Sequence, residues 1–123
     1  MTTEFSDEET IMDIITTKTE RIRELNDSLR RTFTGGRVVM TASVQSLPAD
    51  TVALALTKMR AFNDFSPDND PHLEHDFGSF DLAGEKFFWK IDYYDEQMEC
   101  GSEDPSNPMV TTRVLTLMLA EDY

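Results

Sequence analysis

Apolar residues recur at every third or fourth position near the start of the chain, a period that predicts an amphipathic helix. Ser6 and Glu9 have the spacing of a capping box at its beginning. Lys18 interrupts the apolar stripe, and its long side chain is expected to reach past the apolar face to solvent. Arg30 and Arg31 come at the C-terminal end, where positive charge suits the helix dipole. The stripe consists of Ile11, Ile14, Ile15, Ile22, Leu25 and Leu29.

Shorter elements are predicted after this helix. Gly35 and Gly36 end it, and the run 37–44, rich in β-branched residues, predicts a strand. Pro48 stands near the first turn of a second helix. The expected buried face of that helix comprises Val52, Leu56, Met59 and Phe62. Residues 63–76 are polar and contain two prolines, which predicts a loop.

Two runs of strand-forming residues, 77–82 and 86–94, flank Ala83 and Gly84 and predict a hairpin. Along the second run, successive side chains fall on opposite faces. One face is mainly aromatic and is expected to be core: Phe87, Trp89, Ile91 and Tyr93. The other face carries Phe88, Lys90, Asp92 and Tyr94. This second face either anchors an interface through its aromatic residues or is covered by a helix, with Lys90 paired.

A last helix is predicted after a second acidic loop at 95–107. Asn107 and Pro108 stand at its expected start, and four apolar residues are expected to face inward: Val110, Val114, Leu117 and Met118. The predicted order is helix, strand, helix, strand, strand, helix. A hairpin with few crossovers favours the α+β class, with helices packed on a small, mostly antiparallel sheet. The length of 123 residues suits a single domain over 1–123, with 1–8 as a candidate disordered tail.

The composition narrows the classes of function. No apolar run is long enough to cross a bilayer, and the polar N-terminus is unlike a signal peptide, so a cytoplasmic protein is expected. Cys100 is the single cysteine, which excludes an internal disulfide framework, and acidic neighbours would blunt its thiolate. The chain has no G-x-S-x-G motif. The sequence therefore favours a protein that is not an enzyme, and it names no catalytic residue and no cofactor.

Negative charge is concentrated in the second half of the chain. The formal net charge is −13, yet residues 1–60 hold nine acidic and eight basic residues, whereas residues 61–123 hold fifteen and three. Bare nucleic acid and anionic membranes need cationic surface, so direct binding to either is not expected. The second half should instead carry a strong negative field that attracts cationic partners, unless the charge serves solubility alone.

The densest group of polar residues is the segment 68–76, which holds both histidines of the chain. Imidazole and carboxylate groups are ligands for Zn, Mn or Fe, and the candidate ligands are Asp70, His72, Glu74, His75 and Asp76. The spacing matches no strong metal motif: it is not H-E-x-x-H, and an EF-hand would need Gly at Leu73 and Glu at Ser79. The alternative is an acidic loop in which Asp and Asn bond to backbone amides and His75 packs as a hydrogen-bonded anchor.

Four blocks of sequence resemble one bacterial family of short acidic proteins, a domain of unknown function found on plasmids, prophages and other mobile elements. The blocks are TGGRVV (34–39), DFSPDNDPHLEHDFGSF (64–80), FFWKIDYYD (87–95) and RVLTLMLAEDY (113–123). Leu73 stands where the family pattern has a small residue such as glycine. The resemblance implies no activity, but it implies a mobile-element setting in which small acidic proteins often blunt host defence.

Together, charge and resemblance favour a non-enzymatic inhibitor that mimics DNA and occupies the cationic surface of a nucleic-acid-binding protein or effector complex. Anti-CRISPR and anti-restriction proteins are examples of this type. The candidate partner-binding acids are Asp64, Asp68, Asp70, Glu74, Asp76, Asp92, Asp95, Glu96, Glu99, Glu103 and Asp104. The alternative hypotheses are a small metal-dependent enzyme or metal-binding module that uses the His72/His75 loop, and an interaction module that forms a homodimer through the N-terminal helix.

Overall fold

The computed structural model describes the backbone of residues 7–123 and the side chains of residues 17–123. The described helices are α1 (Asp7–Thr32), α2 (Ala42–Gln45), α3 (Ala49–Ala61) and the short 3-10 helix η1 (Ala120–Asp122). The strands are β1 (Arg37–Met40), β2 (Phe77–Leu82), β3 (Glu85–Tyr94) and β4 (Thr112–Leu119). The α+β class is confirmed. The predicted helix start at Ser6 lies outside the described residues, and so do the side chains of the stripe residues Ile11, Ile14 and Ile15.

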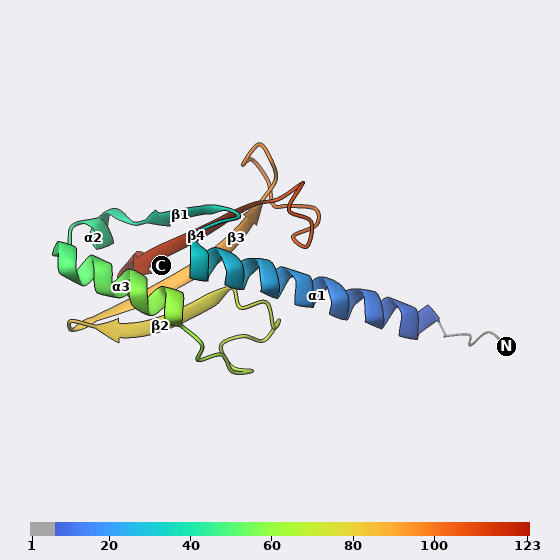
Figure 1. Ribbon diagram of the computed structural model, residues 1–123, viewed down its shortest axis with the longest axis horizontal. Helices are drawn as coiled ribbons and strands as arrows, with labels where there is room; N and C mark the ends of the chain where they lie inside the picture. Colours follow the sequence, from blue (N-terminus) through green and yellow to red (C-terminus); the bar gives the residue numbers. More distant parts are fainter. Residues whose placement is uncertain (1–6) are drawn as a thin grey trace.

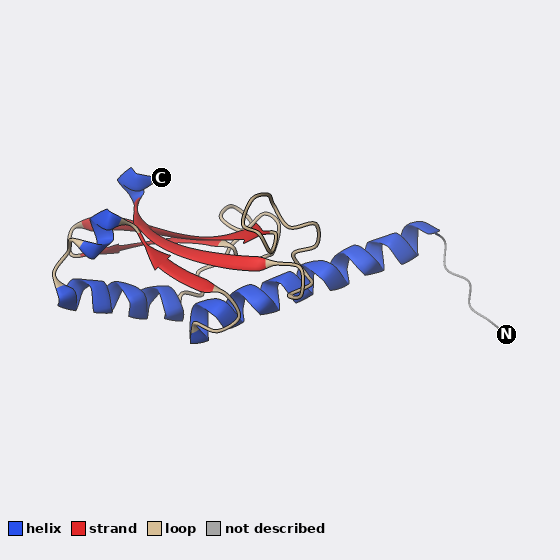
Figure 2. Ribbon diagram, turned by 90° about the horizontal axis from the view of Figure 1, so that it is seen from above, coloured by secondary structure: helices blue, strands red, loops and turns tan. Residues whose placement is uncertain are grey.

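The four strands form one mixed sheet in the order β1-β4-β3-β2. β1 runs parallel to β4, whereas β4 pairs with β3, and β3 with β2, in antiparallel fashion. Helices α1 and α3 pack on one face of this sheet (Figures 1 and 2). On the other face Figure 2 shows the short helix η1, near the C-terminus. The core therefore lies between one sheet face and two helices, centred on Leu29, Met59, Trp89 and Leu117.

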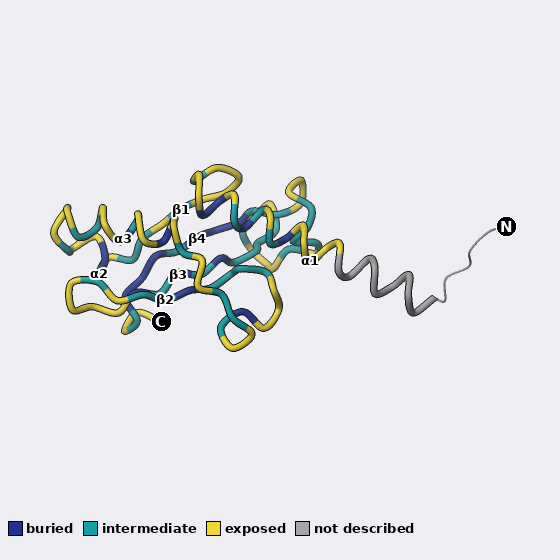
Figure 3. Tube along the Cα trace, turned by 60° about the horizontal axis from the view of Figure 1, so that its bottom comes forward, coloured by how far each residue is buried: buried dark blue, intermediate teal, exposed yellow. Residues whose placement is uncertain are grey.

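The predicted hairpin is present, and its strands match the predicted ranges to within one residue. Ala83 and Gly84 both have positive φ angles (54° and 79°), as a two-residue hairpin turn with a right-handed twist requires. The alternation along β3 is also as predicted, since Phe87, Trp89 and Ile91 are buried. Figure 3 shows that the buried stretches of the chain concentrate in the middle strands of the sheet.

The predicted last helix is wrong, because residues 112–119 form strand β4. Leu115 pairs with Ile91 and Leu117 with Trp89, so these two leucines face the helices. Val114 and Met118 lie on the opposite face, and Val110 is a loop residue that is 38% exposed. A central strand has apolar residues on both faces, and such a run is not distinguishable from a helix by periodicity alone.

The first strand is shorter than predicted and ends at Met40 instead of continuing to Val44. The chain turns into α2 there, and the Asp122 carboxylate accepts hydrogen bonds from the hydroxyls of Thr41 and Ser43 in this turn, both at 2.8 Å. Val44 is fully buried in this short helix. The second predicted helix is present as α3, which begins after Pro48, and Met59 on its predicted face is buried.

Candidate functional site

The acidic residues predicted to bind a partner lie mainly in two loops, 62–76 and 95–111, at the same end of the sheet (Figures 1 and 2). Helix α1 contacts both loops. Arg23 Nη1 donates a hydrogen bond to the carbonyl of Leu73 (3.1 Å), and Lys18 Nζ lies 3.7 Å from an Asp104 carboxylate oxygen. The acidic surface is therefore divided into two parts by a helix that carries basic side chains. Asp92 belongs to neither loop, because it lies on the sheet face away from the helices.

His75 anchors the first loop to α1. Its Nδ1 lies 2.9 Å from an Asp27 carboxylate oxygen, its Nε2 lies 3.5 Å from an Asp70 oxygen, and its ring stacks on Phe65 at 3.7 Å. Asp70 is only 2% exposed and also accepts the backbone N–H of His75 at 3.0 Å. This is the hydrogen-bonded anchor that the sequence offered as the alternative to a metal site. Leu73, in the same loop, has a φ of 60°, a conformation that glycine adopts easily.

The two histidines have different surroundings: His72 is exposed, while both ring nitrogens of His75 face carboxylates. Within residues 17–123, no group of three or more His, Cys, Asp and Glu side chains is arranged to hold a metal ion. The metal hypothesis stays a prediction to which the described geometry adds no support.

A second polar network holds Glu74 in place. The Tyr93 hydroxyl donates to a Glu74 carboxylate oxygen (2.6 Å) and accepts from Asn26 Nδ2 (2.8 Å). Asn26 Oδ1 in turn accepts from Arg113 Nε (2.9 Å), and Arg113 Nη2 donates to the carbonyl of Pro105. Burial, together with the Glu74 hydrogen bond, raises the pKa of Tyr93 far above its ordinary value. One Glu74 carboxylate oxygen is thus hydrogen-bonded within the fold.

Sequence reasoning missed this network because Asn26 and Arg113 are polar residues that are almost fully buried. Asn26 follows Leu25 of the predicted stripe, and Arg113 lies in the segment that was expected to be a helix. The position of Asn26 next to an apolar stripe was the only sign of this network in the sequence. It does not identify Arg113 as the hydrogen-bond partner.

Asp76 gives a pH-dependent prediction. Burial raises the pKa of its carboxyl group, and the nearby Glu74 raises it further. A raised pKa in the folded state means that the ionised carboxylate destabilises the fold, and that this cost is absent below about pH 4. Asp76→Asn should therefore increase the unfolding free energy near neutral pH, and the increase should fade as the pH falls below about 4. Urea unfolding at neutral pH and below about pH 4 measures this difference in unfolding free energy.

Asp68→Asn is the matched control for this prediction, because Asp68 is exposed in the same loop. It should leave stability unchanged at both pH values. A destabilised Asp76→Asn protein at neutral pH would show instead that the ionised carboxylate makes a contact the fold needs.

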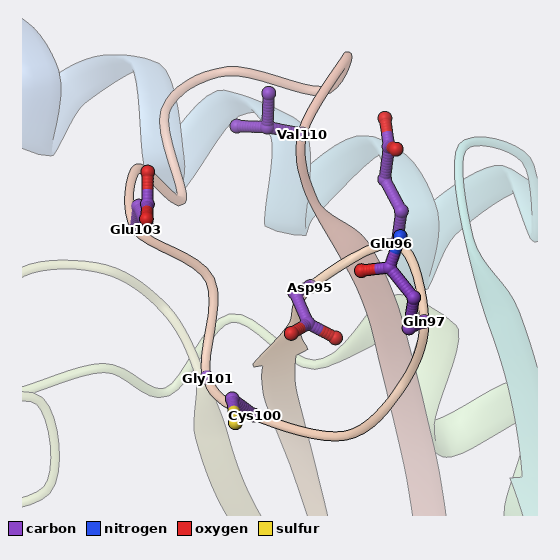
Figure 4. A pocket seen from close by; sticks show the side chains of 7 residues that line it. All are labelled: Asp95, Glu96, Gln97, Cys100, Gly101, Glu103 and Val110. Atoms are coloured by element: carbon purple, nitrogen blue, oxygen red, sulfur yellow. The ribbon is translucent and has the colours of Figure 1, made fainter.

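The second loop presents its carboxylates around a pocket of about 410 Å³ (Figure 4). Its lining includes three acidic side chains, Asp95, Glu96 and Glu103, together with Val110. Glu96 and Glu103 are exposed, as is the neighbouring Glu99. The described ion pairs include Asp104 with Lys18, but none involves the other acids of this loop. A hydrogen bond from Ser106 holds the pKa of Asp104 below its usual value.

The eleven predicted acids therefore divide into three groups. Some are committed to the fold or to ion pairs: Asp70, Glu74, Asp92 and Asp104. Others are exposed in the two loops: Asp64, Asp68, Glu96, Glu99 and Glu103. Asp76 and Asp95 are partly buried, and the Asp95 carboxylate accepts the Glu99 backbone N–H at 3.0 Å.

One protein family matches the chain: its model, described as a protein of unknown function (DUF3768), covers residues 40–122. No curated protein and no solved structure matches the chain. None of the helices that the structure describes is long and apolar enough to cross a membrane.

Proposed function

The chain belongs to DUF3768, a family of proteins of unknown function, and we propose that it is a non-enzymatic interaction protein whose exposed acids bind a cationic surface. The partner is a nucleic-acid-binding protein or effector complex, and binding blocks its access to nucleic acid. The setting that we propose is a mobile element that has to evade a CRISPR complex, a restriction enzyme or a repressor of its host.

The observation that carries this proposal is the exposed acidic surface of the 95–104 loop. Glu96, Glu99 and Glu103 are exposed, and no described ion pair neutralises them. An exposed carboxylate with no internal partner keeps its full field for an incoming cation. Clustered charge of one sign steers a complementary partner at long range and raises the association rate, especially at low salt.

Apolar residues in the last part of the 95–111 loop add to this support. Met109 is 77% exposed and Val110 is 38% exposed, and Val110 lines the acidic pocket. The aliphatic stem of a lysine or arginine can lie along such apolar atoms while its charged end meets the carboxylates. The loop therefore offers both of the features that the basic side chains of a DNA-binding protein need.

Charge reversal in this loop tests the proposal. A triple variant with Glu96, Glu99 and Glu103 changed to Lys should lose a partner that the original protein captures from a bacterial lysate at low salt. The captured partner should be a nucleic-acid effector that high salt releases, because exposed charge pairs are screened. Expression of the protein, but not of the variant, should protect incoming DNA from restriction or CRISPR interference in cells.

The matched control reverses three exposed acids away from the two loops, Glu24, Asp50 and Glu85. This variant has the same net charge as the test variant, so it separates the position of charge from its amount. Equal capture by both variants would reject the 95–104 loop as the binding surface. Capture that does not respond to salt would reject charge complementarity as the mechanism.

A further inference from the structure

The sheet face opposite the helices carries no long helix among the described residues, and its apolar side chains range from exposed Val39 to Val114 and Met118, which their neighbours bury. Of the described elements, only η1 and the C-terminal residue pack over it, at one end (Figure 2). Tyr123 places its ring against Phe77 and Phe88 there, with centroids 6.2 Å and 5.7 Å apart. Solvent-facing sheet surfaces are usually polar, but this face has aromatic and aliphatic side chains on every strand. They are Val39, Phe77, Phe88, Tyr94, Val114 and Met118.

Charge on this face is nearly balanced, unlike that of the second half of the chain as a whole. Its strands contribute Arg37, Lys86 and Lys90 against Asp81 and Asp92, and η1 at its edge adds Glu121 and Asp122. Lys90 and Asp92 are on the same face of one strand, with Nζ and Oδ2 3.1 Å apart. This contact raises the pKa of Lys90, which keeps that side chain charged at neutral pH.

The shape of the face includes both a hollow and a projection. The hollow, about 500 Å³, lies over β3 and β4 and is lined by residues that include Lys90, Asp92, Tyr94 and Thr116. Tyr123 stands at its rim and is 76% exposed. A hollow beside an exposed aromatic ring, and a lysine beside an aspartate, are self-complementary features. In a two-fold interface each contact between positions i and j occurs twice.

We propose that this open sheet face binds a second copy of the same chain, related by a two-fold axis, with Lys90 of each copy opposite Asp92 of the other. The charge of this face argues for this occupant: two chains of net charge −13 repel each other strongly elsewhere, but much less across a face whose positive and negative groups nearly cancel. Nucleic acid is disfavoured, because its phosphates require an excess of positive charge. The inference does not depend on the proposed function, since the face is separate from the 95–104 loop.

Sedimentation equilibrium of the full chain over a wide range of concentration tests the proposal. The original protein should form a dimer. Lys90→Asp and Asp92→Lys, each alone, place like charges opposite one another and should weaken the dimer roughly tenfold or more. The double swap, Lys90→Asp with Asp92→Lys, should restore dimerisation, because it exchanges the two charges and keeps the pattern.

Controls separate this interface from loss of folding and from general charge effects. Lys58→Glu, an exposed change on helix α3, should leave the dimer intact. Tyr123→Ser should weaken the dimer without relying on charge, while far-ultraviolet circular dichroism confirms that each variant is folded. A monomer at the highest concentration would overturn the proposal. A dimer that is indifferent to Lys90→Asp, Asp92→Lys and Tyr123→Ser would also overturn it, whatever happens to partner capture through the 95–104 loop.

Discussion

Replacing Arg30 with methionine is expected to lower the free energy of unfolding by about 3–5 kcal/mol, the range typical of breaking a buried charged contact by removing one partner. Arg30 is fully buried, and its Nη1 donates to the carbonyls of Met59, Arg60 and Phe62 at 3.2, 3.1 and 2.8 Å. These carbonyls end helix α3, where the helix itself supplies no donors. Its Nη2 lies 3.0 Å from Asp27, the residue that also contacts His75.

The loss should be large because methionine leaves several polar groups without a donor. The guanidinium also stacks over Trp89, with Cζ 5.2 Å from the ring centroid, so its removal disturbs the aromatic core. Urea unfolding measures the change. Arg31→Met is the matched control, since Arg31 is the next residue of the same helix and its side chain is exposed; it should change stability by no more than about 0.5 kcal/mol. Similar losses in both variants would contradict the capping role.

The second large effect is expected from Gly78→Ala. A Cβ at Gly78 would lie 2.4 Å from Nε1, 2.5 Å from Cε2 and 2.7 Å from Cζ2 of Trp89, closer than real Cβ contacts. Trp89 is fully buried, and a packed indole ring has no free space into which it can move. Overpacking of this kind costs about 1–3 kcal/mol and sometimes more, and here it should lower the melting temperature.

Trp89 is the single tryptophan of the chain, so its fluorescence reports directly on this contact. Gly101→Ala is the matched control, because the nearest neighbour of its Cβ would be the Tyr93 carbonyl oxygen at an ordinary 3.8 Å. That variant should have the same melting temperature and the same tryptophan emission spectrum as the original protein. An unchanged spectrum and melting temperature in Gly78→Ala would mean that the ring is not packed against this strand as described.

The sequence predicted best those elements whose side chains have two different environments. The alternation along β3 reveals its faces because Phe87, Trp89 and Ile91 are buried while Lys90 and Asp92 are not. In β4 the same rule fails, since Val114 and Met118 are also buried although they face away from the helices. A strand that is apolar on both faces shows no alternation of polar and apolar residues, so the sequence wrongly predicted a helix here.

Interactions between distant parts of the chain were not accessible in this way. Arg30 is expected to interact with the end of its own helix, but it caps α3, an element that comes later in the sequence. The charge distribution along the sequence was enough to predict the acidic loops. Glu96 and Glu103, for example, are exposed loop residues. Only the fold shows that Glu74 is hydrogen-bonded to Tyr93 and that Asp70 is buried. Hydrogen-bond partners and burial depend on tertiary structure.

The parallel pairing of β1 with β4 has a consequence for how the chain folds. β1 ends before the middle of the sequence, yet its partner β4 is the last strand, and β4 also lies between β1 and β3. During synthesis, the hairpin and helices α1, α2 and α3 are made before β4. Phe87, Trp89 and Ile91 therefore lack their neighbours on β4 until that strand has been made. Pairing between segments this far apart in sequence slows folding. Apolar surface that is exposed in the meantime binds chaperones or aggregates with other incompletely folded chains. Synthesis of β4 is thus the step that completes the sheet.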